Sequence, residues 1–210
     1  MTVPLRPVSA VTALTEELRR RVLSGEIPPG TALPEQELSA AYGVARPTVR
    51  EALAALVHEG LLRRERHRSA QVAEVTGEDL DDLMFVRRPL EDLMAASLAG
   101  RRVAEADGAL ERMAALPGDA PWSDVVAEHM ALHQALIVAV GSPRLERLYA
   151  ALAAETRLGL VRLRDSYADR DVLVAEHRDL LDAIGAGSQE AARRAVAAHL
   201  DHGWGAPPGE

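Results

Sequence analysis

The 210-residue sequence contains no cysteine, which excludes disulfides and thiolate metal sites and gives no indication of an oxidising compartment. It also contains no lysine, so all 24 basic residues are arginine. Residues 1–7 lack the apolar core of a signal peptide, and no apolar run approaches the roughly 18 residues that a membrane-spanning helix needs. These absences predict a cytoplasmic protein with no membrane partner.

The charge of the chain is unevenly distributed. The net charge is −8, yet the part up to Val75 has 10 arginines against 9 acidic residues, whereas the remainder has 14 against 23. Because phosphate binding depends on local cations, an acidic second domain is compatible with a DNA-binding first domain. With 48% hydrophobic residues, the length predicts one small domain and one of roughly 130 residues.

A helix-turn-helix is predicted in the first third of the chain. Pro34 begins a short helix, and Tyr42-Gly43-Val44 forms a tight turn into a second one. Apolar residues recur at helical spacing in the second helix, at Val49, Leu53, Leu56 and Val57. This spacing leaves the polar first turn exposed, with Arg46, Pro47, Thr48 and Arg50.

The exposed first turn has side chains that suit double-stranded DNA. A guanidinium group pairs with guanine or phosphate, and Thr48 can reach a phosphate or a thymine methyl group. The alternative to DNA binding is that this first turn is simply a solvated, charged face of the helix. Strand-like segments at 61–65 and 70–75 flank the basic link Arg66-His67-Arg68-Ser69, which predicts a wing. The wing adds a second contact surface beside the helix, which favours DNA binding.

Three motifs of this region together resemble a known family. They are Gly30-x-x-Leu33-Pro34-Glu35-x-x-Leu38, Val44-Ala45-Arg46-Pro47-Thr48-Val49-Arg50-Glu51-Ala52-Leu53 and Glu59-Gly60-Leu61. This pattern resembles the winged-helix domain of GntR-type bacterial repressors. The resemblance implies that Arg46, Thr48 and Arg50 contact DNA and that His67 and Arg68 form the wing tip. The sequence departs from the family at Ala45, where a Ser or Thr helix cap is usual, and at the wing tip, which is usually glycine-rich.

The second domain is predicted to be entirely helical. Thr76-Gly77-Glu78-Asp79 has the form of a capped helix start, which divides the chain into a DNA-binding domain at 8–75, a second domain at 76–203 and a flexible tail at 204–210. Amphipathic helical patterns cover 78–100, 103–116, 122–140, 143–165, 169–186 and 188–202, with Pro89 a predicted kink. The predicted fold class is an α+β winged helix-turn-helix followed by an all-α helical bundle.

Four histidines lie on predicted inward faces of this bundle. His129 and His133 are four residues apart on one face, and His177 and His199 lie on the apolar sides of later helices. A single inward histidine is more often a hydrogen-bonded core residue than a metal ligand. Burying four imidazoles without partners is costly, whereas one divalent cation satisfies all of them. The pattern therefore predicts a transition-metal site, with zinc or nickel favoured.

A second resemblance rests on motifs around these histidines. They are Glu128-His129-Met130-Ala131-Leu132-His133-Gln134-Ala135-Leu136, Gly141-Ser142-Pro143-Arg144-Leu145, Glu176-His177 and His199. They resemble the helical effector domain called FCD, in which an Asp and three histidines hold a metal and a small carboxylate effector often completes the coordination. The resemblance puts His133, His177 and His199 in the histidine positions and His129 in place of the Asp, which makes the site more positive.

Two further residues receive alternative interpretations. Arg87 matches an arginine on the family's first effector-domain helix and can pair with an effector carboxylate. A salt bridge between helices explains Arg87 equally well. His202, one turn after His199, is either an outer partner of the site or exposed.

Together these patterns predict a ligand-responsive transcription regulator, not an enzyme: a homodimeric repressor on a palindromic operator. One alternative is a metal-dependent hydrolase with an accessory DNA-binding domain. The cluster lacks a His-Asp dipeptide and an H-E-x-x-H motif, and the nearby acids Glu128 and Glu176 are expected to face away. The other alternative is a regulator in which four histidines hold a purely structural metal.

Overall fold

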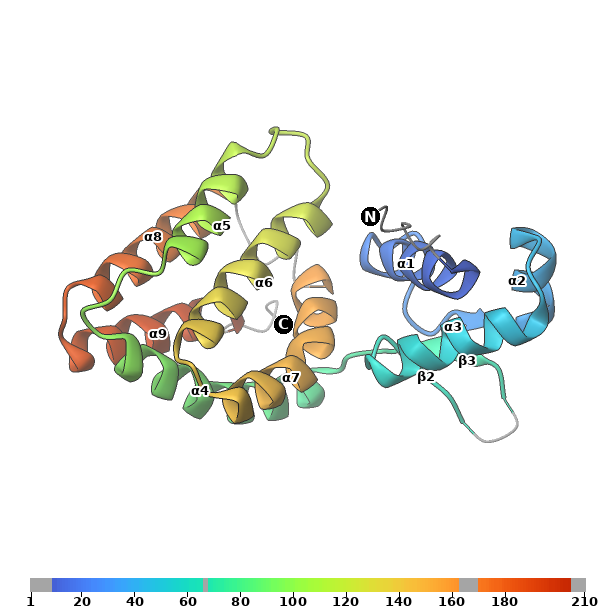
Figure 1. Cartoon of the computed structure of the whole chain (residues 1–210), viewed down its shortest axis with the longest axis horizontal. Coiled ribbons are helices and arrows are strands. Elements are labelled where there is room, and N and C mark those ends of the chain that lie inside the picture. The colour runs from blue at the N-terminus through green and yellow to red at the C-terminus, as the bar shows by residue number, and fades with distance from the viewer. Residues whose placement is uncertain (1–8, 66–67, 163–169, 205–210) are drawn as a thin grey trace, which may run out of the picture. The chain divides into compact units, whose positions relative to one another are not determined.

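The structure, a computed structural model, describes residues 9–65, 68–162 and 170–204. The chain divides into two compact units, Met1–Glu74 and Val75–Glu210, and Figure 1 follows it from α1 to α9. Within the described ranges, no helix is long and apolar enough to cross a membrane.

The first unit combines three helices with a small sheet. Its elements are α1 (Ala10–Leu23), β1 (Ala32–Leu33), α2 (Glu35–Tyr42), α3 (Arg46–His58), β2 (Leu62–Arg63) and β3 (Ala70–Val72). The strand order is β1-β3-β2 and both pairs are antiparallel, with Ala32 opposite Gln71 and Leu62 opposite Val72. This is a winged helix-turn-helix, as predicted.

The turn between α2 and α3 depends on one glycine. Gly43 ends α2 in the left-handed region, with φ of 64°, where glycine avoids the steric penalty of a Cβ atom. Val49, Leu53 and Leu56 of α3 are fully buried and pack the helix into the unit. Val57, also predicted to pack inward, is half-buried. The turn and this apolar stripe together leave the first turn of α3 at the surface.

Helix α1 was not predicted, although it supports the helix-turn-helix. Ser9 caps the helix by accepting a hydrogen bond from the Thr12 backbone N–H at 3.1 Å. The Arg19 guanidinium donates two hydrogen bonds to Glu59 at the end of α3, at 2.6 and 2.8 Å. Arg21 donates to the Tyr42 hydroxyl of α2 at 2.9 Å. Helix α1 is therefore bonded to both helices of the motif.

The wing strands are shorter than the predicted segments 61–65 and 70–75. Pairing is confined to two residues of β2 and three of β3, and β3 also pairs with β1, which was not predicted. A two-residue strand has no measurable alternation of apolar and polar residues, so β1 leaves no periodic signal. Residues 66–67, including the predicted wing-tip residue His67, lie outside the described residues.

Helix α3 begins without a side-chain cap. Ala45 occupies the N-cap position with extended backbone, φ −66° and ψ 146°, and offers no acceptor to the first-turn N–H groups. Ala45→Ser is therefore expected to raise the free energy of unfolding by about 0.5–1 kcal/mol, measured by urea unfolding of the full chain. The control is Ala54→Ser at an exposed position inside α3, where serine brings no cap. A gain no larger than that of the control contradicts the assignment.

The second unit is a helical bundle. Its elements are α4 (Gly77–Leu98), α5 (Ala104–Ala115), α6 (Trp122–Ala139), α7 (Pro143–Arg162), α8 (Arg170–Gly185) and α9 (Gln189–Trp204). A capping box starts α4: the Thr76 hydroxyl accepts from the Asp79 N–H at 3.1 Å, and Asp79 accepts from the Thr76 N–H at 2.9 Å. The helix continues through Pro89, and α9 extends into the predicted tail as far as Trp204. Residues 205–210 of that tail lie outside the described part.

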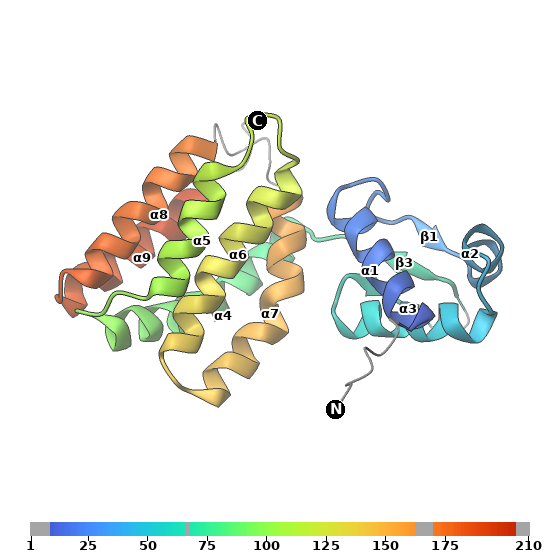
Figure 2. The same ribbon diagram turned by 45° about the horizontal axis from the view of Figure 1, so that its top comes forward.

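The helices of the bundle enclose one apolar core. Helix α5 packs against α6 and α8, and α6 against α7, and these helices lie side by side in Figure 2. Helix α4 packs against α7 and α9. Fully buried members of the core include Met94, Leu98, Met113, Leu132, Leu136 and Ile184. The four histidines come from helices α6, α8 and α9, so the same packing that forms the core brings their side chains inward. The predicted all-α bundle is confirmed.

Candidate metal centre and nucleic-acid interface

The four predicted histidines meet at one point inside the bundle. Their exposed fractions are 3% for His129, 0% for His133 and His177, and 7% for His199. One ring nitrogen from each lies within 4.8 Å of the corresponding atom in the others. The Nε2 atom of His133 is 3.3 Å from that of His177 and 3.2 Å from that of His199. The structure therefore supplies a buried set of nitrogen donors.

The outer nitrogens of these rings fix which atoms point inward. His177 Nδ1 is 2.7 Å from the Leu173 carbonyl oxygen, which can only accept, so Nδ1 carries the proton. His133 Nδ1 lies 3.1 Å from the Glu91 carboxylate. When each of these two rings carries its proton on Nδ1, each turns an Nε2 lone pair toward the other, which is repulsive unless a cation lies between them. Two nitrogen ligands of a tetrahedral zinc ion are about 3.3–3.4 Å apart, so the spacing fits such an ion.

The remaining ring nitrogens also have informative surroundings. His199 Nδ1 lies 3.9 Å from Glu176 Oε2. His129 Nδ1 is buried and makes no hydrogen bond. Metal-bound histidines commonly place the second ring nitrogen against a carboxylate or a carbonyl, as His133 and His177 do here. The donor set and its surroundings therefore fit a divalent transition metal.

Burial holds three of the four histidines, His129, His177 and His199, in the neutral form that binds metals. The pKa of His177 is lowered to about 3, mainly by desolvation and also by the neighbouring His133, while the Leu173 carbonyl acts in the opposite direction. Desolvation and the adjacent imidazoles also lower the pKa of His129 and of His199 well below the ordinary value. These three imidazoles are consequently unprotonated at neutral pH.

A buried ion pair lies beside the histidines. Arg87 donates to Glu91 Oε1 through Nε at 3.1 Å and also through Nη2, and Tyr149 donates to the same oxygen at 3.1 Å. Burial alone would raise the pKa of the Glu91 carboxyl, but Arg87 and then His133 lower it below its ordinary value. The charges of Arg87 and Glu91 therefore offset one another, and Arg87 Nη1 stays buried without a hydrogen bond.

Two expectations about charged residues are corrected. The salt bridge offered as the alternative for Arg87 joins two residues of α4, Arg87 and Glu91, and not two helices; the contact between helices is the hydrogen bond to Tyr149. Glu176 faces His199 and not away from the cluster. Glu128 does point elsewhere, to Arg112 at 2.9 Å. The side chain of His202 lies outside the described residues.

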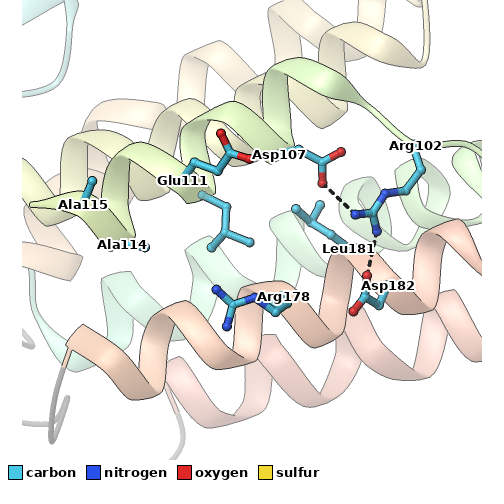
Figure 3. A pocket seen from close by; sticks show the side chains of 9 residues that line it. Arg102, Asp107, Glu111, Ala114, Ala115, Arg178, Leu181 and Asp182 are labelled. Carbon is cyan, nitrogen blue, oxygen red and sulfur yellow. Dashed lines mark hydrogen bonds and ion pairs between the residues drawn. The ribbon is translucent and has the colours of Figure 1, made fainter.

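A separate groove runs between α5 and α8, with a volume of about 650 Å³ (Figure 3). Arg102 bridges it, with ion pairs to Asp107 at 3.3 Å and to Asp182 at 2.6 Å. None of the four histidines lines this groove. Two of its carboxylates, Asp107 and Asp182, therefore pair with the same arginine.

The predicted DNA-contacting residues lie together at the start of α3. Arg46 and Pro47 are exposed, Thr48 is half-buried, and the Arg50 side chain is 62% exposed. Arg50 donates to Glu35, the first residue of α2, with its shortest contact at 3.1 Å. The exposed guanidinium is thus oriented without being buried, and an exposed ion pair of this kind exchanges readily for a phosphate or a base.

The wing carries one described basic residue at its tip. Arg68 is 69% exposed and forms an ion pair with Glu65 at 2.9 Å. Arg64, at the base of the wing, lies 3.5 Å from Glu35, which also holds Arg50. One carboxylate of α2 therefore connects the start of α3 with the base of the wing.

Comparisons with known proteins agree with this architecture. The FCD domain matches residues 82–202, and the bacterial regulatory proteins of the gntR family match residues 11–72. An uncharacterized HTH-type transcriptional regulator "in unstable DNA locus" of Streptomyces ambofaciens is 33% identical over 192 residues, which are 88% of this chain and 79% of that protein.

Two further relatives resemble nearly the full chain. The "Probable D-xylose utilization operon transcriptional repressor" of Paenarthrobacter nicotinovorans is 26% identical over 182 residues, 85% of this chain and 80% of that protein. The crystal structure of a GntR transcriptional regulator from Rhodococcus sp. RHA1 has a TM-score of 0.78 and 27% identity, covering 91% of this chain and 93% of the other.

Proposed function

Because the chain belongs to the GntR family of bacterial regulatory proteins and carries an FCD domain, we propose that this transcription regulator is a repressor controlled by a small carboxylate ligand at a metal centre. The matched families and the relatives are transcription regulators and not enzymes, so the hydrolase alternative is set aside. The repressor role is supported by the relative named as the repressor of a D-xylose utilization operon.

The observation that carries the metal proposal is the set of facing Nε2 atoms. His133, His177 and His199 would hold the ion, with His129 as fourth ligand, and an all-nitrogen set suits zinc or nickel. A bound divalent cation supplies uncompensated positive charge in a buried place, because Glu91 is already neutralised by Arg87. An anionic ligand is the natural complement of that charge. Arg87 Nη1, buried without a hydrogen bond, is the donor proposed for the ligand's carboxylate.

The DNA proposal rests on the exposed start of α3. Arg46, Pro47, Thr48 and Arg50 would enter the major groove, with Arg68 and His67 of the wing against the backbone or the minor groove. Two copies of the chain would then occupy the halves of a palindromic operator. Helix α4 begins only a few residues after β3 and carries Arg87, so it is the covalent connection through which a ligand would bias the dimer arrangement.

Replacing Arg50 tests the DNA interface. Arg50→Ala is expected to weaken binding to an operator selected from random duplexes by about tenfold or more, the loss of one bidentate base contact. Gel shifts at one fixed salt concentration measure this, and circular dichroism checks folding. Arg194→Ala is the matched control, since Arg194 is an exposed arginine of the second unit that pairs with Glu190. Equal affinity of Arg50→Ala and wild type would refute the assignment.

A purely structural metal is the second candidate, because four nitrogen donors already complete a tetrahedral site. Removing the metal with a chelator distinguishes a regulatory metal from a purely structural one. A regulatory metal predicts that metal removal abolishes the change in operator affinity caused by a carboxylate ligand. A structural metal predicts that metal removal lowers thermal stability but leaves the ligand-induced change in operator affinity intact.

A further inference from the structure

One carboxylate lies among the arginines of the proposed DNA interface. Glu35, the first residue of α2, accepts hydrogen bonds from Arg50 Nε at 3.3 Å and from Arg50 Nη2 at 3.1 Å. Arg64, at the base of the wing, also donates to Glu35, at 3.5 Å. The Glu35 side chain is 20% exposed, against 62% for Arg50. The carboxylate is therefore less accessible than the guanidinium that it holds.

The surrounding arginines keep Glu35 ionised. The hydrogen bonds from Arg50 lower the pKa of the Glu35 carboxyl, burial acts in the opposite direction, and the charges of Arg64 and Arg46 lower it further. Sequence-independent DNA binding depends on the positive charge that a protein presents to phosphates. A negative charge beside the start of α3 lowers that attraction equally for every DNA sequence.

The bonds to Glu35 occupy one edge of the Arg50 guanidinium. They use Nε and Nη2, which form the side edge, whereas Nη1 donates no hydrogen bond within the described part of the chain. The end edge, formed by Nη1 and the second N–H of Nη2, keeps two parallel donors. Guanine presents two acceptors, O6 and N7, to such a pair of donors. Glu35 thus fixes the guanidinium and leaves free an edge that can bind guanine.

We propose that Glu35 is a specificity-determining residue of the DNA interface, which positions Arg50 for a guanine contact and offsets its attraction for phosphate. A phosphate contact needs only a nearby positive charge, whereas a bidentate base contact needs a guanidinium of fixed orientation. Glu35 therefore weakens binding to random DNA more than binding to the operator. This inference rests on the proposed DNA interface and adds the residue that makes it selective.

Glu35→Gln tests the proposal, because it keeps the shape of the side chain and removes its charge. Binding of the full-length chain to the selected operator and to a random-sequence duplex is followed by fluorescence anisotropy over a range of NaCl concentrations. Affinity for the random duplex is expected to rise severalfold at low salt, and its dependence on log[salt] to steepen by about 0.9, the effect of one more phosphate contact. The ratio of operator affinity to random-duplex affinity is expected to fall about tenfold.

Glu37→Gln is the matched control. Glu37 is exposed and belongs to the same first turn of α2, so the variant removes the same charge at the same helix end. Two residues along a helix, its side chain lies on a different face from that of Glu35. The control is expected to keep the wild-type affinity ratio and salt dependence. A purely structural role of Glu35 would lower both affinities together and would not steepen the salt dependence.

A double variant separates positioning from simple repulsion of DNA. In an Arg50→Ala background, Glu35→Gln is expected to leave the affinity ratio unchanged, since no guanidinium remains to be positioned. An equal fall of the ratio with and without Arg50, or a Glu35→Gln ratio equal to that of Glu37→Gln, would overturn the role of Glu35. Wild-type operator affinity in Arg50→Ala alone would instead overturn the DNA interface itself.

Discussion

Glu91→Ala is expected to lower the free energy of unfolding by about 3–5 kcal/mol, the effect of removing one partner from a buried ion pair. The substitution leaves the guanidinium of Arg87, 1% exposed, without its carboxylate, and it also removes the acceptor of Tyr149 and the partner of His133 Nδ1. Denaturant unfolding of the full chain measures the loss. Zinc affinity is expected to fall as well, by about 10–100-fold, because His133 loses the group that orients its ring.

The next residue of α4 provides the control. Asp92 forms an exposed ion pair with Arg193 at 3.1 Å, so Asp92→Ala is expected to change stability by less than about 1 kcal/mol. Replacing both buried charges, with Arg87→Met and Glu91→Leu, is expected to restore most of the stability, since no unpaired charge remains. A loss in Glu91→Ala no larger than in Asp92→Ala would show that the pair has no structural role.

Acid is expected to destabilise the metal-free protein steeply below about pH 6.5, the ordinary histidine pKa. The folded-state pKa of His177 is lowered to about 3, and those of His129 and His199 are lowered as well. The unfolded chain therefore binds more protons than the folded chain in this window. The stability that the neutral imidazoles contribute is complete above pH 6.5 and is lost as the pH falls toward their folded-state values. Each such group adds a slope of about 1.4 kcal/mol per pH unit.

Thermal unfolding between pH 7.5 and 5 tests this dependence. Metal-loaded protein is the comparison, and its loss of stability is expected to begin at lower pH, because protons must displace the ion before the rings are protonated. A melting temperature of the metal-free protein that stays constant from pH 6.5 to 5 would contradict buried neutral imidazoles.

The helical part of the fold was predictable because its signals are long and repeated. Helix α6, for example, begins at Trp122 as predicted and ends one residue before the predicted Val140. Helix α1 was missed although Ser9 supplies a cap and Leu14, Leu18 and Val22 supply an apolar face, because the helix carries none of the motif residues. Strand β1 could not be found from periodicity, since two residues contain none.

The inner part of the candidate site was predictable, whereas its charged surroundings were not. Inward helical spacing identified the four histidines, and the structure brings them together. Glu91 had a usable signal, since it follows Arg87 by four residues on a face with apolar neighbours. Glu176 had none: its position beside His177 gives no information about the His199 ring of another helix. Pairing between helices depends on packing angles that a single sequence does not specify.

The amount of zinc bound by metal-free protein tests the central claim most directly. Wild-type chain, stripped with a chelator, dialysed against Zn²⁺ and analysed for metal content, is expected to hold one ion per chain. His133→Ala, which removes the Nε2 atom that lies 3.3 Å from that of His177 and 3.2 Å from that of His199, is expected to lose it. A wild-type chain that retains no zinc or nickel, or a variant that retains as much as wild type, would contradict a metal centre at these four histidines.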